Sequence, residues 1–315
     1  MNSGIRVIAP GFLSTVQDLG RHGLAHLGVS PAGAADSTAL RLGNLLVGNS
    51  ANAPAVEMTL LGGTFEFEAD SVIAITGADF GPTVDGQAVP AWTSLLVRRG
   101  QRIQLGPTRA GARAYLCIRG GIRVPLVLGS ASTHLQTRLG GHDGRALRKG
   151  DMIELGDPPG SREFRPVRLR PSLIPGASGP LRATRGPQWE QFTKVADELF
   201  FSSAFKVLED SNRVGLRLGG PTLERRAQGD MLTEGVSAGA VQVPDNRQPI
   251  LLFVERPTTG GYPKIANVIS ADLSRVGQLR PRDEVRFAQV SIAEAVELLR
   301  AQEALIGPDA LEPAG

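Results

Sequence analysis

The chain has 315 residues and a formal net charge of +3, with 41% hydrophobic and 21% charged residues. This composition is that of an ordinary soluble protein with a sizeable core, and the length favours two domains. The small net charge and the 5% aromatic content argue against nucleic acid as a partner, because such partners require positive charge and stacking surfaces.

The cysteine content and the N-terminus bear on the compartment. Cys117 is the only cysteine, so an intrachain disulfide is excluded, and its apolar neighbours indicate a buried strand residue. The N-terminal residues lack the pattern of a secretory signal peptide, and no apolar run approaches the roughly 18 residues that span a bilayer. The sequence therefore predicts a cytoplasmic protein without membrane segments.

The first half of the chain reads mainly as strands. Residues 5–8 and 63–68 alternate apolar and polar positions, and the run 72–76 is typical of a strand buried on both faces. Asp85 and Gly86 form a dipeptide that favours a hairpin turn. The pattern predicts a mainly β protein.

A helix is predicted over residues 37–46. The side chain of Asp36 is placed to cap its N-terminus, and Gly48 and Asn49 end it. The small-residue loop 30–36 that leads into it presents backbone N–H groups, which is also how a loop binds an anion. The cap is the favoured interpretation.

A turn followed by a half-buried strand occurs at residues 99–106 and 149–156, and more loosely at 282–287. The distant third copy predicts a second lobe that repeats the first. A polar stretch rich in Pro and Gly, residues 157–162, is the predicted boundary, and residues 175–180 form a second such stretch. The predicted organisation is an N-terminal β-rich lobe (1–157), a C-terminal lobe with a terminal helix (163–306) and a disordered tail (307–315).

Two helices are expected in the second lobe. Residues 187–192 resemble a helix start. Ser291 and Glu294 form a capping box. The helix that follows places apolar residues on one face, namely Ile292, Ala295, Val296 and Leu299.

The histidines give no metal signal. His22 and His26 have a spacing that suits zinc on a helix, but the surrounding glycines disfavour a helix and a third ligand does not stand nearby. We interpret them as polar loop residues. His142 lies in a glycine-rich segment that reads as a tight turn. No metal site is predicted.

The segment 257–265 has the most chemical content. It joins two apolar runs, 250–254 and 265–269, and Gly260 and Gly261 allow the backbone to adopt positive φ and to come close to a ligand. Lys264 is one of four lysines beside thirty arginines. It is interpreted either as a point charge or proton donor for a ligand, or as an exposed charge on a turn between strands.

Taken together, several stretches in order along the chain resemble the allophanate hydrolase subunit 2 family, also called the biotin-dependent carboxyltransferase family. The resemblance covers roughly residues 4–290. The stretches that carry it are 11–21, 28–36, 41–49, 77–79, 120–121, 124–125, 128–130, 185–188, 210–215, 234–236, 242–244, 258–265 and 278–281.

The resemblance implies a fold, partners and an activity. The fold is a two-lobed protein of cyclophilin-like β-barrel architecture. The activity is that of the C subunit in an ATP-dependent, 5-oxoprolinase-like hydrolase that opens 5-oxoproline to glutamate. The partners are a subunit-B-like protein, which resembles allophanate hydrolase subunit 1, and a subunit-A-like amidohydrolase. The chain is expected to be inactive alone and to hold no covalent cofactor, with ATP used by the assembled complex.

The motif positions and the residue chemistry also nominate site residues. The candidate catalytic residues are Lys264, Asp36 and Asp79. The candidate substrate-binding residues are Thr258, Thr259, Gly260, Gly261, Tyr262, Gln242 and Arg280.

Two other functions remain open at this point. One is the carboxyltransferase component of a biotin-dependent, urea carboxylase-like system, although the chain shows no biotin-carrier motif and no ATP-grasp region. The other is a non-enzymatic regulator that binds a kinase-inhibitor protein. The sequence also departs from the family pattern, because Glu255 and Pro257 stand where Asp and Gln are expected and Pro31 and Ala32 interrupt a plainer stretch.

Overall fold

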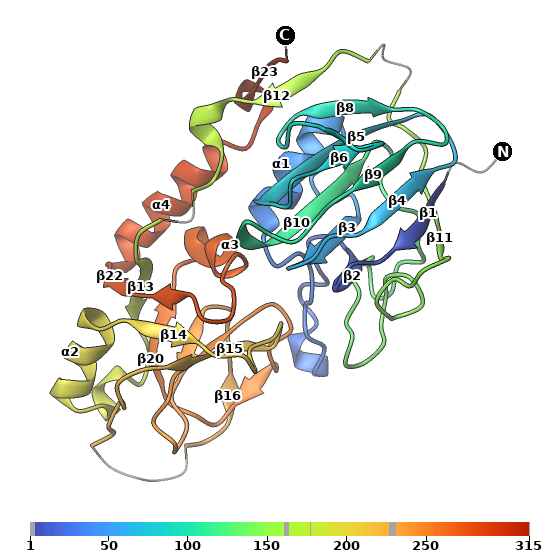
Figure 1. The fold of residues 1–315 in the computed structure, drawn as a ribbon. Coiled ribbons are helices and arrows are strands. Elements are labelled where there is room, and N and C mark those ends of the chain that lie inside the picture. The colour runs from blue at the N-terminus through green and yellow to red at the C-terminus, as the bar shows by residue number, and fades with distance from the viewer. Residues whose placement is uncertain (1–3, 161–163, 177, 227–230, 315) are drawn as a thin grey trace. The chain divides into compact units, whose positions relative to one another are not determined.

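The computed structural model describes residues 4–160, 164–176, 178–226 and 231–314 (Figure 1). Parts of several predictions lie outside them: residues 1–3 of the N-terminus, 161 and 162 of the predicted boundary, 163 and 227–230 of the predicted C-terminal lobe, 177 of the second Pro/Gly stretch and 315 of the predicted tail. The chain divides into two compact units, one from residues 1–21, 32–176 and 304–315 and one from residues 22–31 and 177–303. The predicted lobes 1–157 and 163–306 stay a prediction.

The first unit contains two antiparallel sheets. Its six-stranded sheet has the order β11(Met152–Glu154), β1(Gly4–Ala9), β4(Thr64–Phe67), β9(Arg102–Gln104), β6(Thr83–Val84) and β7(Gln87–Ala88). Its five-stranded sheet has the order β2(Leu13–Gln17), β3(Ala55–Thr59), β10(Ala110–Ile118), β5(Ser71–Asp79) and β8(Ser94–Val97). Residues of both sheets form one buried cluster that includes Ile5, Phe65, Ile75 and Leu116, so the sheets pack face to face.

Helix α1(Ser37–Val47) covers the other face of the five-stranded sheet (Figure 1). The N–H of Ala39 donates to the side chain of Asp36, and Gly48 ends the helix in the left-handed conformation, so the predicted cap and stop are confirmed. Leu42 and Leu46 pack with Tyr115 and other residues in a second buried cluster.

The C-terminal end of the chain shows one wrong prediction. Residues 308–313, predicted as disordered tail, form η5(Pro308–Ala310) and β23(Leu311–Pro313). Strand β23 pairs with β12(Val167–Leu169), which follows the predicted boundary and precedes η2(Pro171–Leu173). Local composition could not show this pairing, because the two strands are 144 residues apart at the Arg168–Glu312 pair.

The second unit is built on an eight-stranded sheet. Its order is β21(Glu284–Val285), β14(Phe205–Val207), β15(Gly215–Gly219), β18(Ile250–Leu252), β17(Ala240–Gln242), β20(Lys264–Val268), β13(Leu181–Arg185) and β22(Phe287–Gln289). The two edge strands, β21 and β22, are separated only by Arg286, so the sheet curls round until its edges meet in one chain segment. This is a nearly closed barrel, and the mainly β prediction is confirmed.

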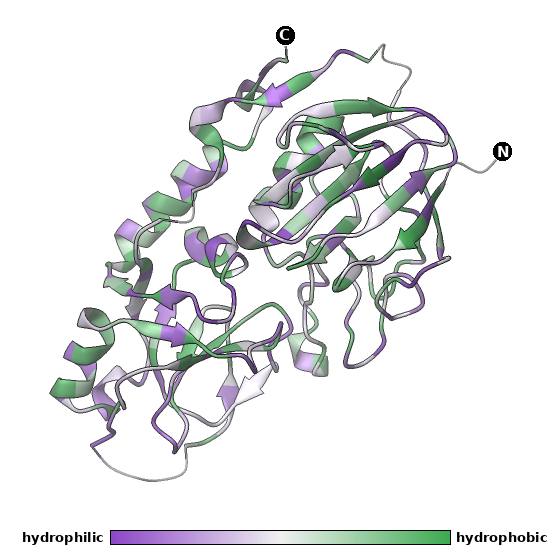
Figure 2. Cartoon of the chain, in the orientation of Figure 1, coloured by the Kyte–Doolittle hydropathy of each residue, from purple (hydrophilic) through white to green (hydrophobic). Residues whose placement is uncertain are grey.

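Short helices complete the second unit: η1(Ala25–Leu27), η3(Trp189–Gln191), α2(Lys194–Ser202), η4(Ser270–Asp272), α3(Leu273–Val276) and α4(Ile292–Ala304). Helix α2 packs where the barrel closes, since Phe200 stacks on Phe287 with ring centroids 4.4 Å apart. Helix α4 begins at the predicted capping box. Helix α4 carries both hydrophobic and hydrophilic residues along its length (Figure 2). None of its residues is buried.

Among the described residues, no helix is both long and apolar enough to cross a bilayer.

Candidate functional site

Lys264 is the first residue of β20 and lies opposite Gln242 of β17, where the ladder register shifts. Such irregularities are common beside functional sites because they redirect side chains. The Lys264 side chain is only 5% exposed. The alternative of an exposed charge on a turn is therefore wrong, and the lysine is a buried cation.

The counter-ion of Lys264 is Glu234 of β16(Glu234–Gly235). The Nζ atom lies 2.5 Å from Oε1 of Glu234, whose side chain is 44% exposed. The Nε2 of Gln188 donates to the same oxygen at 2.8 Å, and Oε1 of Gln188 accepts from the backbone N–H of Lys264 at 3.2 Å. Lys264 first and Gln188 second hold the pKa of Glu234 below its ordinary value.

The ammonium of Lys264 has spare hydrogen-bonding capacity. It carries three N–H donors. Within the described part of the chain, Nζ is buried and its close partner is the Glu234 carboxylate, so donors remain without an acceptor. A buried cation with donors left over is costly unless another acceptor comes to it. The cluster of Lys264, Glu234 and Gln188 is therefore the candidate site in the second unit for a negatively charged ligand group.

The segment 258–262 forms one side of this cluster. Strand β19(Thr259–Gly260) pairs with β16, with Gly260 opposite Glu234. A Cβ at Gly260 would lie 2.4 Å from Nε2 of Gln242, whose amide donates to the carbonyl of Tyr262 at 3.4 Å. A larger residue here would therefore displace the Gln242 side chain.

Neither Gly260 nor Gly261 uses the positive φ that glycine allows. Thr259 is exposed, Thr258 is half-buried, and the side chain of Tyr262 is exposed. The structure thus brings Gln242, Gly260 and the Tyr262 backbone to Lys264, while the two threonines remain candidates by position.

Three other candidates have structural partners of their own. Arg280 is held by Asp283, whose carboxylate accepts from its backbone N–H at 2.8 Å and from its guanidinium at 3.3 Å. In the first unit, Asp79 accepts from the N–H of Gly81 and lies 3.8 Å from the guanidinium of Arg109. Asp36, also in the first unit, is the α1 cap.

A buried polar network supports that cap. The N–H of Asp36 donates to the Tyr115 hydroxyl at 2.8 Å, and this hydroxyl donates to Oε2 of Glu57 at 2.7 Å. The same Glu57 oxygen accepts from the N–H of Ala35, and Arg113 lies 3.8 Å from the other one. Burial and the nearby carboxylates raise the pKa of Tyr115. The network fixes the entry of the small-residue loop into α1, a role that the sequence did not predict.

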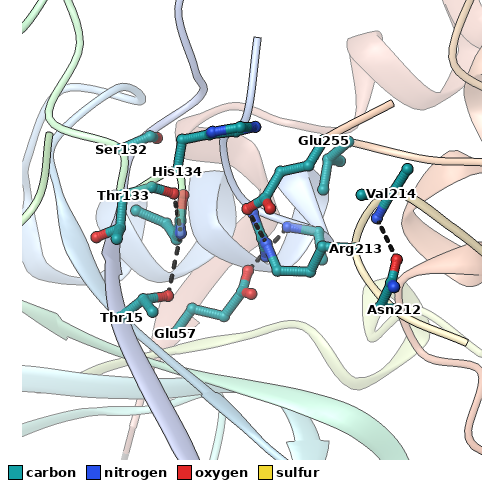
Figure 3. Close-up of polar contacts among 12 residues, drawn as sticks. Thr15, Glu57, Ser132, Thr133, His134, Asn212, Arg213, Val214 and Glu255 are labelled. Atoms are coloured by element: carbon teal, nitrogen blue, oxygen red, sulfur yellow. Dashed lines mark hydrogen bonds and ion pairs between the residues drawn. The ribbon is translucent and has the colours of Figure 1, made fainter. Parts of the chain in front are cut away.

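The structure also explains Glu255, which stands where the family pattern has Asp. Its carboxylate lies 2.5 Å from Nε of Arg213, and both side chains are buried (Figure 3). The side chain of Asn212 accepts from the N–H of Val214 at 2.8 Å and so shapes the turn that holds Arg213 (Figure 3). Glu255 thus retains a charged partner in the segment 210–215.

The two most relevant residues that the sequence prediction missed are Gln188 and Glu234. Both stood in stretches that carried the family resemblance, 185–188 and 234–236. The available signal was that each stretch combines a polar side chain with a glycine, as in Gly186–Gln188 and Glu234–Gly235. Their distance along the chain from Lys264 concealed the contact.

Comparison with known proteins places the chain in a family. Residues 27–289 match the family model described as the carboxyltransferase domain, subdomain A and B, so the chain belongs to this family.

Within the family, the chain is 40% identical to the C subunit of 5-oxoprolinase from Escherichia coli over 299 residues, which is 95% of either chain. It is 35% identical to urea amidolyase of Saccharomyces cerevisiae over 325 residues, which is 96% of this chain and 18% of that one. Among solved structures, it is similar to the urea carboxylase of Kluyveromyces lactis with a TM-score of 0.92 and 33% identity, over 99% of this chain and 29% of that one. The chain thus spans less than a third of the length of these two relatives.

Proposed function

We propose that this protein is the C subunit of an ATP-dependent 5-oxoprolinase, which opens 5-oxoproline to glutamate. The observation that carries the proposal is the 40% identity to the C subunit of the Escherichia coli 5-oxoprolinase over 95% of both chains. We further propose that the nearly closed sheet is a cyclophilin-like barrel, and that a subunit-B-like and a subunit-A-like protein complete the enzyme. The nucleotide is used by the assembled complex.

The chemistry suits a buried cation. The lactam of 5-oxoproline is a stable amide, and its opening requires a fixed position for the substrate and stabilisation of negative charge on oxygen. Lys264 supplies a positive charge away from water, where its effect on a ligand is larger than at the surface. Gln242 and the segment 258–262 shape the adjacent space, and Asp36, Asp79 and Arg280 are further candidates.

The experiment is reconstitution. The chain is co-expressed with its two proposed partners, the complex is isolated, and glutamate release from 5-oxoproline is measured with and without ATP. We expect a stable complex, ATP-dependent release, and almost none from the isolated chain. Separate elution of this chain at micromolar concentration, or full turnover by it alone, would contradict the proposal.

The similarity to urea amidolyase and urea carboxylase supports a second candidate, a carboxyltransferase that acts with a separate biotin carrier. The same preparation distinguishes the two. Activity that requires a biotinylated protein and bicarbonate would favour the second candidate.

A further inference from the structure

The Lys264–Glu234 ion pair is asymmetric. Lys264 is 5% exposed and starts a strand in the middle of the barrel sheet, whereas Glu234 is 44% exposed. If the pair separates, the carboxylate can be hydrated where it stands, but the ammonium cannot. Glu234 is therefore the member that can leave.

The backbone that carries Glu234 is also weakly held. Strands β16 and β19 contain two residues each, and within the described ranges they pair with one another and with no other strand. An isolated two-stranded ribbon is marginal in stability, and such segments open locally at low cost. Lys264, by contrast, belongs to a five-residue strand paired on both sides, with β17 and β13.

We propose that Glu234 is an internal placeholder, whose carboxylate a carboxylate of the ligand replaces on the Lys264 ammonium. The position beside Nζ already accommodates a carboxylate, so a ligand group of the same shape and charge fits it. Gln188 lies beside this position and can donate to either occupant, because its Nε2 now bonds the Glu234 oxygen nearest Lys264.

The exchange keeps the buried cation paired throughout. One carboxylate leaves as another arrives, and the departing one is already half in water. Resting on the proposed function, the incoming group is the carboxylate of 5-oxoproline, which is ionised at neutral pH. Lys264 then anchors the substrate, and affinity is set by competition between the two carboxylates.

Binding to the full chain tests the exchange. Isothermal titration with 5-oxoproline and with sodium acetate compares the wild type with Glu234→Gln, which removes the competing charge but keeps the side chain's shape. We expect the Kd for both ligands to fall about five-fold in Glu234→Gln, as when an ion pair with one exposed partner is removed from the free state. Lys264→Met should weaken binding by at least about ten-fold.

The matched control is Glu224→Gln. Glu224 is an exposed carboxylate in the same unit, 2.9 Å from Arg247, and its loss changes the net charge by the same amount. We expect wild-type affinity. Equal tightening in Glu224→Gln and Glu234→Gln would mean a general charge effect and would overturn the proposal, as would unchanged or weaker binding in Glu234→Gln, or the absence of binding in every variant.

A second readout follows the displaced carboxylate. With ¹³C-labelled glutamate, the Glu234 carboxyl should titrate below the ordinary glutamate range in the free chain, because Lys264 lowers its pKa. Saturation with 5-oxoproline should move this titration upward. A titration that does not move would show that Glu234 stays on Lys264.

The outcomes separate the exchange from the proposed function. If acetate binds with the expected pattern but 5-oxoproline does not, the exchange stands and the proposed substrate is wrong. If the reconstituted complex releases glutamate but Glu234→Gln leaves its KM unchanged, the function stands and the exchange is wrong.

Discussion

Replacement of Lys264 by Met should separate activity from stability. The sequence alone predicts little effect on folding because a turn lysine contributes little to a core, but the structure gives a different reason. Met retains most of the buried aliphatic chain and removes an ammonium with spare donors, while the lost ion pair has a partially exposed partner. Such a pair contributes about 1 kcal/mol or less, and replacing a buried charge by an apolar side chain of similar size is often neutral or stabilising.

We therefore expect the free energy of unfolding of Lys264→Met to stay within about 1 kcal/mol of the wild type, a Tm shift of about 2–4 °C for units of this size. In the reconstituted enzyme, kcat/KM should fall at least about 100-fold, which corresponds to about 2.7 kcal/mol. Lys264→Arg should not restore activity fully, because the planar guanidinium is larger and the site is closely packed.

Differential scanning calorimetry and the glutamate-release assay measure the two effects. The control is Lys194→Met, since Lys194 is 87% exposed on α2 and lies 3.7 Å from Glu198. It should leave both quantities unchanged. Wild-type kcat/KM in Lys264→Met would refute the reasoning and return the lysine to a structural role.

Three further predictions concern the first unit. Asp36→Ala should lower the stability of the first unit by about 1 kcal/mol through loss of the α1 cap, whereas Asp36→Ser, which can still cap the helix, should not. Loss of enzymatic activity in both variants would favour the catalytic role of Asp36. Gly77→Ala should lower the free energy of unfolding by at least about 2 kcal/mol, because Gly77 has a φ of 89° and a Cβ there would lie 2.4 Å from the Arg113 carbonyl oxygen. Gly86→Ala, at a φ of 82° with open space around the Cβ, should lower it by about 1 kcal/mol. Equal losses in the two variants would contradict the argument. Hydrogen bonds from Arg145 hold the pKa of Asp151 below its ordinary value, so the contribution of Asp151 to stability is present at neutral pH and lost as the pH falls through the folded-state pKa. Asp151→Asn should therefore lower the free energy of unfolding by on the order of 1 kcal/mol at pH 7. A difference in stability from the wild type that did not close below about pH 4 would be evidence against this prediction.

The sequence predicted those features that local chemistry determines. Helix α1 was readable because its cap, apolar stripe and glycine stop lie within 13 residues. The turn–strand pattern was readable for the same reason, and its turns have positive φ at Gly100, Gly150 and Arg282. Cys117 was expected on a buried strand and lies in β10, where burial raises its pKa.

The candidate site was only partly readable, because its contacts are distant in sequence. Lys264 was singled out, but its burial depends on pairing with β13 and β17, and its partner atoms come from residues 30 and 76 positions earlier. Gly260 was noted as a glycine, yet a sequence cannot distinguish a glycine that uses positive φ from one that lies close to a neighbouring side chain. Only the register of β16 on β19 and the position of Gln242 decide this.

The buried charges of the second unit show why Lys264 differs from a structural cation. Asp272 is fully buried and accepts from the backbone and guanidinium of Arg182 and from Arg275, an arrangement that joins η4 to β13. Arg213 and Glu255 are buried together.

In those pairs the acidic partner is enclosed, so no ligand can replace it without opening the core. At Lys264 the cation is enclosed and the carboxylate is half in solvent. If the pair served only to join two elements, exposure of the Glu234 carboxylate, the more easily hydrated partner, to solvent would have no structural purpose. Because the enclosed cation keeps its charge whichever carboxylate faces it, exchange of that carboxylate is the one change that this pair permits at low cost.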